Sequence, residues 1–144
     1  MDKVRGVKMQ DRFKFRAYNK ELRKMYEVDT ICPYEDNYTK GGEVFLKGIQ
    51  YNSFYFPEEV EVMQCTGLKD KNGNLIYEGD ILGGIYLGYI EYCNECKCLQ
   101  LKVKDYGCLA CEGDMHWCEL VEAEEQNELE VIGNIYENPE LLED

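Results

Sequence analysis

The sequence predicts a mainly β fold, and three observations support this prediction. Tyr occupies 12 of the 144 positions, and aromatic residues, which cover the pleated surface of a sheet well, make up 12% of the chain. Several short segments alternate polar and apolar residues with a period of two. Turn signals such as the Asn72-Gly73 pair separate these segments. The length suits one domain, or one domain with a small appendage.

The first predicted strand lies at residues 12–18, where basic and apolar residues alternate. The alternation places Phe13, Phe15 and Ala17 on one face, toward a presumed core, and leaves the basic side chains on the other face. Basic residues interleaved with aromatic ones can also form a stacking surface for nucleic acid. Because both phenylalanines point away from the charges, the pattern favours a structural strand.

The remaining strands are predicted from the same alternation and from the turn signals between them. In the N-terminal part, strands are expected at residues 25–32, 43–47 and 50–56. In the C-terminal part, we expect a strand at 60–65, a tight turn at 72–73 and a turn at 78–82 that leads into a strand. A meander of short strands is expected over 86–120, with turns near 94–95, 105–107 and 112–114, followed by a final strand at 129–136. Pro57 marks a weak boundary, which predicts an N-terminal β region at 1–59 and a second region at 60–144.

The C-terminus is predicted to end in a short helix. Asn138 can cap this helix, and Pro139 suits its first position because the missing N–H needs no partner there. Only about one helical turn follows, so we expect the segment to close the fold rather than to carry a function. The acidic run at residues 122–125 is typical of a solvated surface.

Charge is distributed unevenly along the chain. The formal net charge is −13, which makes extensive binding to a nucleic-acid backbone unfavourable. Residues 1–25 carry nine Lys or Arg against three Asp or Glu, whereas no Lys or Arg follows Lys104. The basic N-terminal segment can pack against the acidic C-terminal half. The alternative is that the acidic half is an interaction surface.

No targeting segment is evident in the sequence. The longest uncharged apolar run, residues 81–90, contains three glycines and is too short to span a membrane. Residues 1–9 lack the apolar stretch of a secretory signal. Eight cysteines in such a chain are more typical of metal binding or burial in a reducing cytosol than of disulfides. We therefore expect a soluble, cytoplasmic protein.

Three blocks of the sequence together resemble the YopX family of bacteriophage and prophage proteins. They are KFRAY at residues 14–18 with Lys24-Met25 behind it, MQCTGLKDKNG at 63–73 continued by IYEGDI at 76–81, and EVIGNIYENPELL at 130–142. The second and third blocks are long and specific. Their glycines suit turns or bulges and their Ile and Val residues suit a core, so the blocks mark a fold rather than an active site.

The resemblance implies a mainly β protein whose C-terminal part, from about residue 60, is a small SH3-like barrel. It brings no established activity, and no catalytic residue is transferred from the family. Family members often begin just before the first block, so Met9 is a candidate start alongside Met1, with residues 1–8 as an extension. The phage context implies a location in the cytoplasm of the host bacterial cell.

A pair of CxxC motifs is the strongest chemical signal. Their spacing can supply four thiolates to a tetrahedral, structural Zn²⁺, and the candidate ligands are Cys93, Cys96, Cys108 and Cys111. Two predicted turns fall at one end of the meander, which would bring three of these together and leave Cys108 less well placed. The nearby residues Cys98, His116 and Cys118 can substitute. The alternative is that the cysteines are simply packed in strands.

Enzymatic function is weakly supported by the sequence. The only histidine, His116, lies beside Trp117 and is more typical of packing than of a general base. A redox role for a CxxC motif would favour a helix N-terminus, whereas these motifs lie among predicted strands and turns.

The sequence therefore favours a non-enzymatic phage or prophage accessory protein that binds an unknown host or phage macromolecule. We expect its partner surface in the acidic C-terminal half, near Tyr86, Tyr89 and Tyr92. One alternative is a zinc-stabilised nucleic-acid or protein adaptor that uses the basic N-terminal strand. Another is an acidic decoy that occupies a DNA-binding host protein, and an enzyme ranks last. No membrane partner is expected, and homo-oligomerisation is left open.

Overall fold

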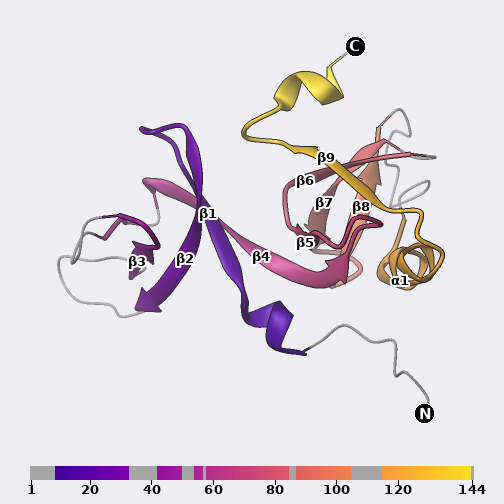
Figure 1. Ribbon diagram of the computed structural model, residues 1–144, viewed down its shortest axis with the longest axis horizontal. Helices are drawn as coiled ribbons and strands as arrows, with labels where there is room; N and C mark the ends of the chain where they lie inside the picture. Colours follow the sequence, from indigo (N-terminus) through magenta and orange to yellow (C-terminus); the bar gives the residue numbers. More distant parts are fainter. Residues whose placement is uncertain are drawn as a thin grey trace. The chain divides into compact units, whose positions relative to one another are not determined.

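The computed structural model of the 144-residue chain describes residues 9–32, 42–49, 54–56, 58–84, 87–104 and 115–143 (Figure 1). The chain folds as two compact units. We call residues 13–64 the N-terminal unit, and residues 1–12 together with 65–144 the C-terminal unit.

The described residues confirm a mainly β fold. Their strands are β1 (Phe15–Asn19), β2 (Lys24–Cys32), β3 (Glu43–Leu46), β4 (Val60–Lys69), β5 (Leu75–Tyr77), β6 (Asp80–Gly83), β7 (Gly88–Cys93), β8 (Cys98–Val103) and β9 (Glu130–Asn134). Their helices are α1 (Trp117–Glu125) and two 3-10 turns, η1 (Met9–Phe13) and η2 (Pro139–Leu142). The pairings are antiparallel and give two sheets, with the orders β3-β2-β1-β4-β5 and β8-β7-β6-β9.

The N-terminal unit is built around β1, which pairs with β2 on one side and with β4 on the other. The side-chain oxygen of Asn19 accepts hydrogen bonds from the amides of Glu21 and Leu22, at 3.1 and 3.0 Å, and so turns the chain from β1 into β2. The core of this unit consists of Ala17, Val44, Leu46 and Val60, covered by Tyr26, Val28, Ile49 and Tyr55.

Phe13 does not take the core position that the alternation predicts. It ends η1, and its side chain is 71% exposed. Pairing between β1 and β4 begins only at Phe15, opposite Gln64, so the residues before it lack the ladder that holds an alternating pattern on two faces. Phe15 is half-buried and Ala17 is fully buried, which confirms the predicted strand from Phe15 onward.

The other strands predicted in the first half are largely confirmed. The strands expected at 25–32, 43–47 and 60–65 correspond to β2, β3 and the first part of β4. The predicted tight turn then leads into β5, and Gly73 has a φ of 84° that a glycine adopts without strain. Of the strand expected at 50–56, Tyr55 bridges to Val44, whereas residues 50–53 lie outside the described residues.

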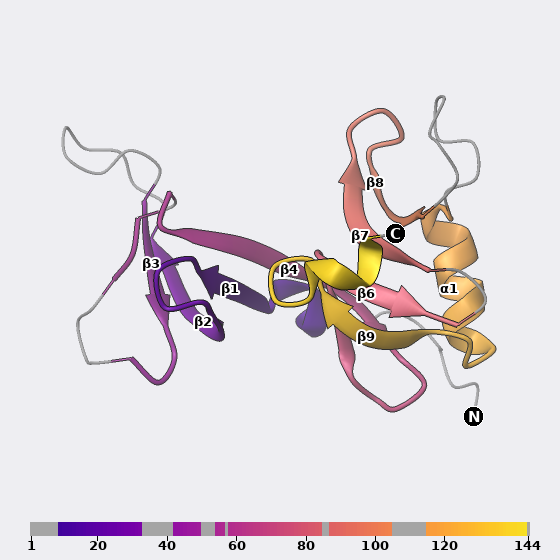
Figure 2. The ribbon, with the colours of Figure 1, turned by 90° about the horizontal axis from the view of Figure 1, so that it is seen from above.

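In the C-terminal unit, α1 lies along one side of the sheet formed by β6 to β9, as Figure 2 shows. Leu120 and Ala123 of α1 pack against Leu82 of β6, Ile90 of β7 and Leu101 of β8. The remaining buried members of this core are Leu68, Ile76, Val103 and Leu129. Full burial of one such aliphatic side chain stabilises the fold by about 1.5–3 kcal/mol, so this cluster fixes the position of α1.

The helix α1 replaces the end of the predicted meander, and its presence corrects that prediction. It begins after His116, whose amide donates a 2.8 Å hydrogen bond to Oε2 of Glu119, as in a capping box. Leu120 and Ala123 lie about one turn apart and are both buried, so the segment has the period of a helix rather than of a strand. The acidic run at 122–125 ends this helix.

The sheet of the C-terminal unit is open, which differs from the closed barrel that the family resemblance implies. No pairing joins β8 to β9 in the part of the chain that the structure describes. The outer edge of β8 instead bonds to Met115, whose amide and carbonyl pair with those of Leu101. The β7–β8 hairpin confirms the turn near 94–95. The turns expected at 105–107 and 112–114 lie outside the described residues.

The predicted C-terminal helix is confirmed as the single turn η2, with Pro139 in its first turn. Asn138 was expected to cap this helix through its side chain but does not, because its Oδ1 accepts a 3.2 Å hydrogen bond from the amide of Asn134 instead. A Cβ added to Gly133 would lie 2.7 Å from Cδ1 of Leu141. The glycine therefore lets η2 pack directly on β9.

Candidate functional site

Three cysteines lie at the end of the β7–β8 hairpin. Cys93 ends β7, Cys98 begins β8, and the two residues lie directly opposite each other. Cys96 lies in the turn between them, and its amide donates a 3.4 Å hydrogen bond to Sγ of Cys93. Lys97 completes the turn with a φ of 56°. The first CxxC motif therefore lies in a tight turn, with the amide of Cys96 directed at the sulfur of Cys93.

The second CxxC motif, Cys108 and Cys111, lies outside the described residues. Within the described part of the chain, no group of three or more His, Cys, Asp or Glu side chains has a geometry that could hold a metal ion. Of the possible substitutes, Cys98 is half-buried, and Cys118 is exposed on α1. The four-cysteine zinc site therefore stays a prediction.

His116 and Trp117 lie at the N-terminus of α1. The backbone of His116 takes part in the capping box described above, and Trp117 packs against the core of the C-terminal unit. The guanidinium of Arg12 lies 5.9 Å from the centroid of the Trp117 ring, within the range of a cation–π contact. His116 and Trp117 therefore have structural roles in the C-terminal unit: the first caps α1 and the second packs on the core.

The outer side of α1 is an acidic face, which we define by Glu119, Glu122 and Glu125. All three side chains are exposed, whereas Leu120 and Ala123 are buried against the sheet. The helix has no basic residue in its last turn, where the helix dipole favours positive charge. Like charges spaced three residues apart also destabilise a helix by about 0.2–0.5 kcal/mol per pair. Glu119 lies in the first turn and completes the capping box, so the cost to helix stability falls on Glu122 and Glu125.

The tyrosines predicted beside the acidic half differ in exposure. Tyr92 on β7 is 48% exposed, Tyr89 is half-buried, and Tyr86 lies outside the described residues. Tyr92 therefore offers an aromatic surface on the sheet of the C-terminal unit.

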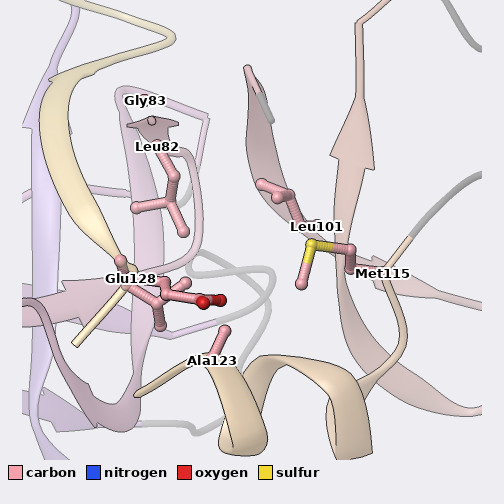
Figure 3. Close-up of a pocket in the computed structure, with 7 residues that line it drawn as sticks. Leu82, Gly83, Leu101, Met115, Ala123 and Glu128 are labelled. Carbon is pink, nitrogen blue, oxygen red and sulfur yellow. The ribbon is translucent and has the colours of Figure 1, made fainter. Parts of the chain in front are cut away.

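A small cavity lies between α1 and the sheet (Figure 3). Its lining consists of Leu82, Gly83, Leu101, Met115, Ala123, Glu128 and Leu129. The volume open to the centre of a water molecule is about 20 Å³, which is room for about one water. A cavity of this size is far below that of a pocket for a small-molecule substrate, so it is a packing gap beside α1.

Asp70 is a buried carboxylate to which the sequence analysis gave no role. Its Oδ1 accepts hydrogen bonds from the amides of Asn72 and Asn74, at 3.0 and 2.9 Å, and its Oδ2 accepts one from the amide of Val131 at 3.1 Å. Burial alone raises the pKa of Asp70, but these backbone hydrogen bonds outweigh it and lower the pKa below its ordinary value. Its position two residues before an Asn-Gly turn is the signal that could have identified it.

Comparison with known proteins places the chain in a family. Residues 14–143 match the family described as YopX protein. Among solved structures, the crystal structure of protein EF1440 from Enterococcus faecalis is similar, with a TM-score of 0.55 and 27% sequence identity over 90% of this chain and 97% of that one. A search of the curated proteins found no match. No helix in the described residues is long and apolar enough to cross a membrane. The match across residues 14–143 shows that this chain belongs to the YopX family.

Proposed function

We propose that this protein is a non-enzymatic phage or prophage accessory protein that binds a host or phage macromolecule in the host cytoplasm. The acidic face of α1 carries the proposal. Its carboxylates stay exposed and meet no basic residue of their own helix, although negative charge at Glu125, in the last turn, costs helix stability. Exposed carboxylates held on a rigid helix attract and orient a partner with a basic surface.

The charge of the whole chain favours a protein partner over a nucleic acid. With a net charge of −13, the molecule repels the phosphate backbone and attracts basic proteins. A DNA-binding host protein offers such a basic surface. The acidic decoy predicted from the sequence is therefore one form of the same proposal.

The experiment is affinity capture from a host lysate with three forms of the full chain. They are the wild type, the acidic-face variant Glu119→Gln/Glu122→Gln/Glu125→Gln, and a control variant Glu21→Gln/Asp29→Asn/Glu58→Gln, whose three sites are exposed in the N-terminal unit. We expect the wild type and the control to retain a basic protein that high salt releases, and the acidic-face variant to lose it. Equal capture by all three forms would contradict the proposal, because the carboxylates of α1 would then not be needed for binding. The control carries the same change in net charge, so it separates the position of the carboxylates from the total charge.

A second candidate function is a zinc-stabilised adaptor, and the turn of the first CxxC motif favours it. The hydrogen bond from the Cys96 amide to the sulfur of Cys93 supports this candidate, because it places the first CxxC motif in a tight turn. Four thiolates would leave no open coordination position, so the zinc would stabilise the fold rather than catalyse a reaction.

Metal content and thiol counting test the adaptor on protein purified without chelator. The adaptor predicts about one zinc per chain and four thiols that react only after EDTA is added. Cys96→Ser should lower the zinc content, whereas Cys32→Ser, which changes a half-buried cysteine of β2 outside the candidate ligands, should leave it unchanged. Absence of zinc, together with thiol reactivity that does not depend on EDTA, would reject the adaptor.

A further inference from the structure

We propose that the β1–β2 hairpin of the N-terminal unit binds single-stranded nucleic acid. We define this basic hairpin as residues 13–24, which are Phe13, Lys14, β1, the turn after it and the first residue of β2 (Figure 1). It belongs to the N-terminal unit, whereas the acidic face lies on α1. The inference is therefore independent of the proposed function, which concerns the acidic face.

The exposure of Phe13 removes the reason for which a stacking surface was set aside at the sequence level. Both phenylalanines were expected to face the core, away from the basic side chains. The Phe13 side chain is instead 71% exposed, and it precedes Lys14, which is also exposed. An exposed aromatic ring beside a cation can stack on an unpaired base of any sequence.

The basic hairpin carries a local positive charge. It contains five Lys or Arg against one Glu, which gives a formal charge of +4. Lys20 is paired with Glu61 at 2.8 Å. The other exposed cations are Lys14, Arg23 and Lys24. At physiological salt, electrostatic interactions decay over about 8 Å, so a phosphate at the hairpin responds mainly to these nearby charges and less to the net charge of −13.

Arg23 has a backbone conformation that is unfavourable for its residue type. Its φ is 52°, in the left-handed region that glycine and asparagine adopt more readily. Its side chain is exposed, and among the described residues no hydrogen bond or ion pair of the guanidinium offsets this strain. A strained residue without a structural contact points to a binding role.

The length of β1 matches a short nucleic-acid strand. Its five residues, Phe15–Asn19, extend over about 16 Å, which is the length of about five stacked nucleotides. Lys24 lies directly opposite Asn19 at the far end of the strand. A single strand along the hairpin therefore stacks one base on Phe13 and brings its phosphates to Arg23 and Lys24. The bases of a duplex are already stacked on each other, so a duplex lacks the contact with the ring.

Fluorescence anisotropy with the full-length protein and a labelled oligothymidylate tests the charges. The charge variant is Arg23→Gln/Lys24→Gln, and the matched control Lys69→Gln/Lys71→Gln changes two exposed lysines of the C-terminal unit. If Lys14, Arg23 and Lys24 each neutralise one phosphate, raising sodium chloride from about 50 to about 200 mM weakens binding by the wild type and by the control about 20-fold. The charge variant should lose only about threefold. Equal salt dependence of all three forms would overturn the proposal.

Phe13→Ala separates stacking from charge. Loss of the stacked ring should weaken binding about tenfold at both salt concentrations, without a change in the salt dependence. Because the ring is exposed, the Tm should stay at the wild-type value. Wild-type affinity of this variant would overturn the stacking surface.

Arg23→Gly tests whether the arginine serves binding or folding. Glycine adopts a φ of 52° without strain, so the Tm should not fall, whereas the affinity for the oligothymidylate should. A lower Tm with unchanged affinity would give Arg23 a structural role and contradict the proposal.

Competition identifies the class of partner. Unlabelled oligothymidylate should displace the labelled strand, whereas its duplex with oligoadenylate and a polyglutamate of similar charge should displace less at equal concentration. Equal displacement by polyglutamate would mean that the hairpin recognises negative charge alone, as on an acidic protein. Equal displacement by the duplex would mean that no base is stacked, and either result overturns the proposal.

Discussion

Asp70 joins the β4–β5 turn to β9 in the C-terminal unit through one buried carboxylate. It holds the β4–β5 turn through the amides of Asn72 and Asn74, and it fixes the start of β9 through the amide of Val131. In Asp70→Asn, one oxygen becomes an NH₂ group, which leaves at least one of these amides without its acceptor. We expect the free energy of unfolding at pH 7 to fall by about 1–3 kcal/mol in urea denaturation. Asp29→Asn, at an exposed site, is the control and should change it little.

The lowered pKa of Asp70 makes part of this stability depend on pH. A carboxyl group whose pKa in the folded state lies below its unfolded value of about 3.8 stabilises the fold above that pH. The contribution is lost as the pH falls through the folded pKa. The stability difference between wild type and Asp70→Asn should therefore shrink between pH 5 and pH 2, and a difference that stays constant over this range would contradict the role of the charge.

Among the elements, α1 shows how a helix can be missed in a chain whose other segments alternate. Its signals were present, because His116 and Glu119 have capping-box spacing and the acidic run contains good helix formers. The run was interpreted as solvated surface, and the exposure of Glu122 and Glu125 agrees with that interpretation. What the sequence did not reveal was that Leu120 needed a helical period to reach the core.

The packing of α1 can be tested at Leu120, which is fully buried. Leu120→Ala removes a core side chain and leaves a cavity, so we expect the free energy of unfolding to fall by about 2–5 kcal/mol. Glu122→Ala changes an exposed position of the same helix and relieves like-charge repulsion, so it should be neutral or slightly stabilising. Equal stability of both variants in urea denaturation would contradict the orientation of α1, in which Leu120 faces the core and Glu122 faces solvent.

The strands were more predictable than the helix because alternation and turn residues are local signals. β2, β3 and the Asn72-Gly73 turn follow from them directly. Phe13 departs from the pattern because the strand partner, and not the alternation, decides where β1 begins. The pairing of Cys93 with Cys98 likewise depends on the strand register, which cannot be predicted from the spacing of residues in the sequence.

At the scale of the whole molecule, charge is the dominant property. Ion pairs such as Lys20–Glu61 at 2.8 Å and Lys71–Glu130 at 3.1 Å lie at exposed positions and contribute little, about 0–1 kcal/mol each. Each pair is neutral, so the pairs leave the net charge of −13 unchanged, and this charge repels itself in the compact state.

Screening of this repulsion gives a prediction for thermal unfolding. The Tm should rise when sodium chloride is raised from low to physiological concentration at pH 7, because salt shortens the range of the repulsion. The acidic-face variant should show a smaller rise than the wild type. A Tm that falls with added salt would mean that attractive pairs, rather than net repulsion, dominate the electrostatics.

The central claim is that the acidic face of α1 binds a basic partner, and carboxylate footprinting tests it most directly. The protein alone and the complex recovered by capture are labelled with a carbodiimide and an amine, and the labelled carboxyl groups are quantified by mass spectrometry. The account predicts that the partner protects Glu119, Glu122 and Glu125, while Glu21 and Glu58 in the N-terminal unit keep their labelling. Unchanged labelling of the three α1 carboxylates in the complex would contradict it.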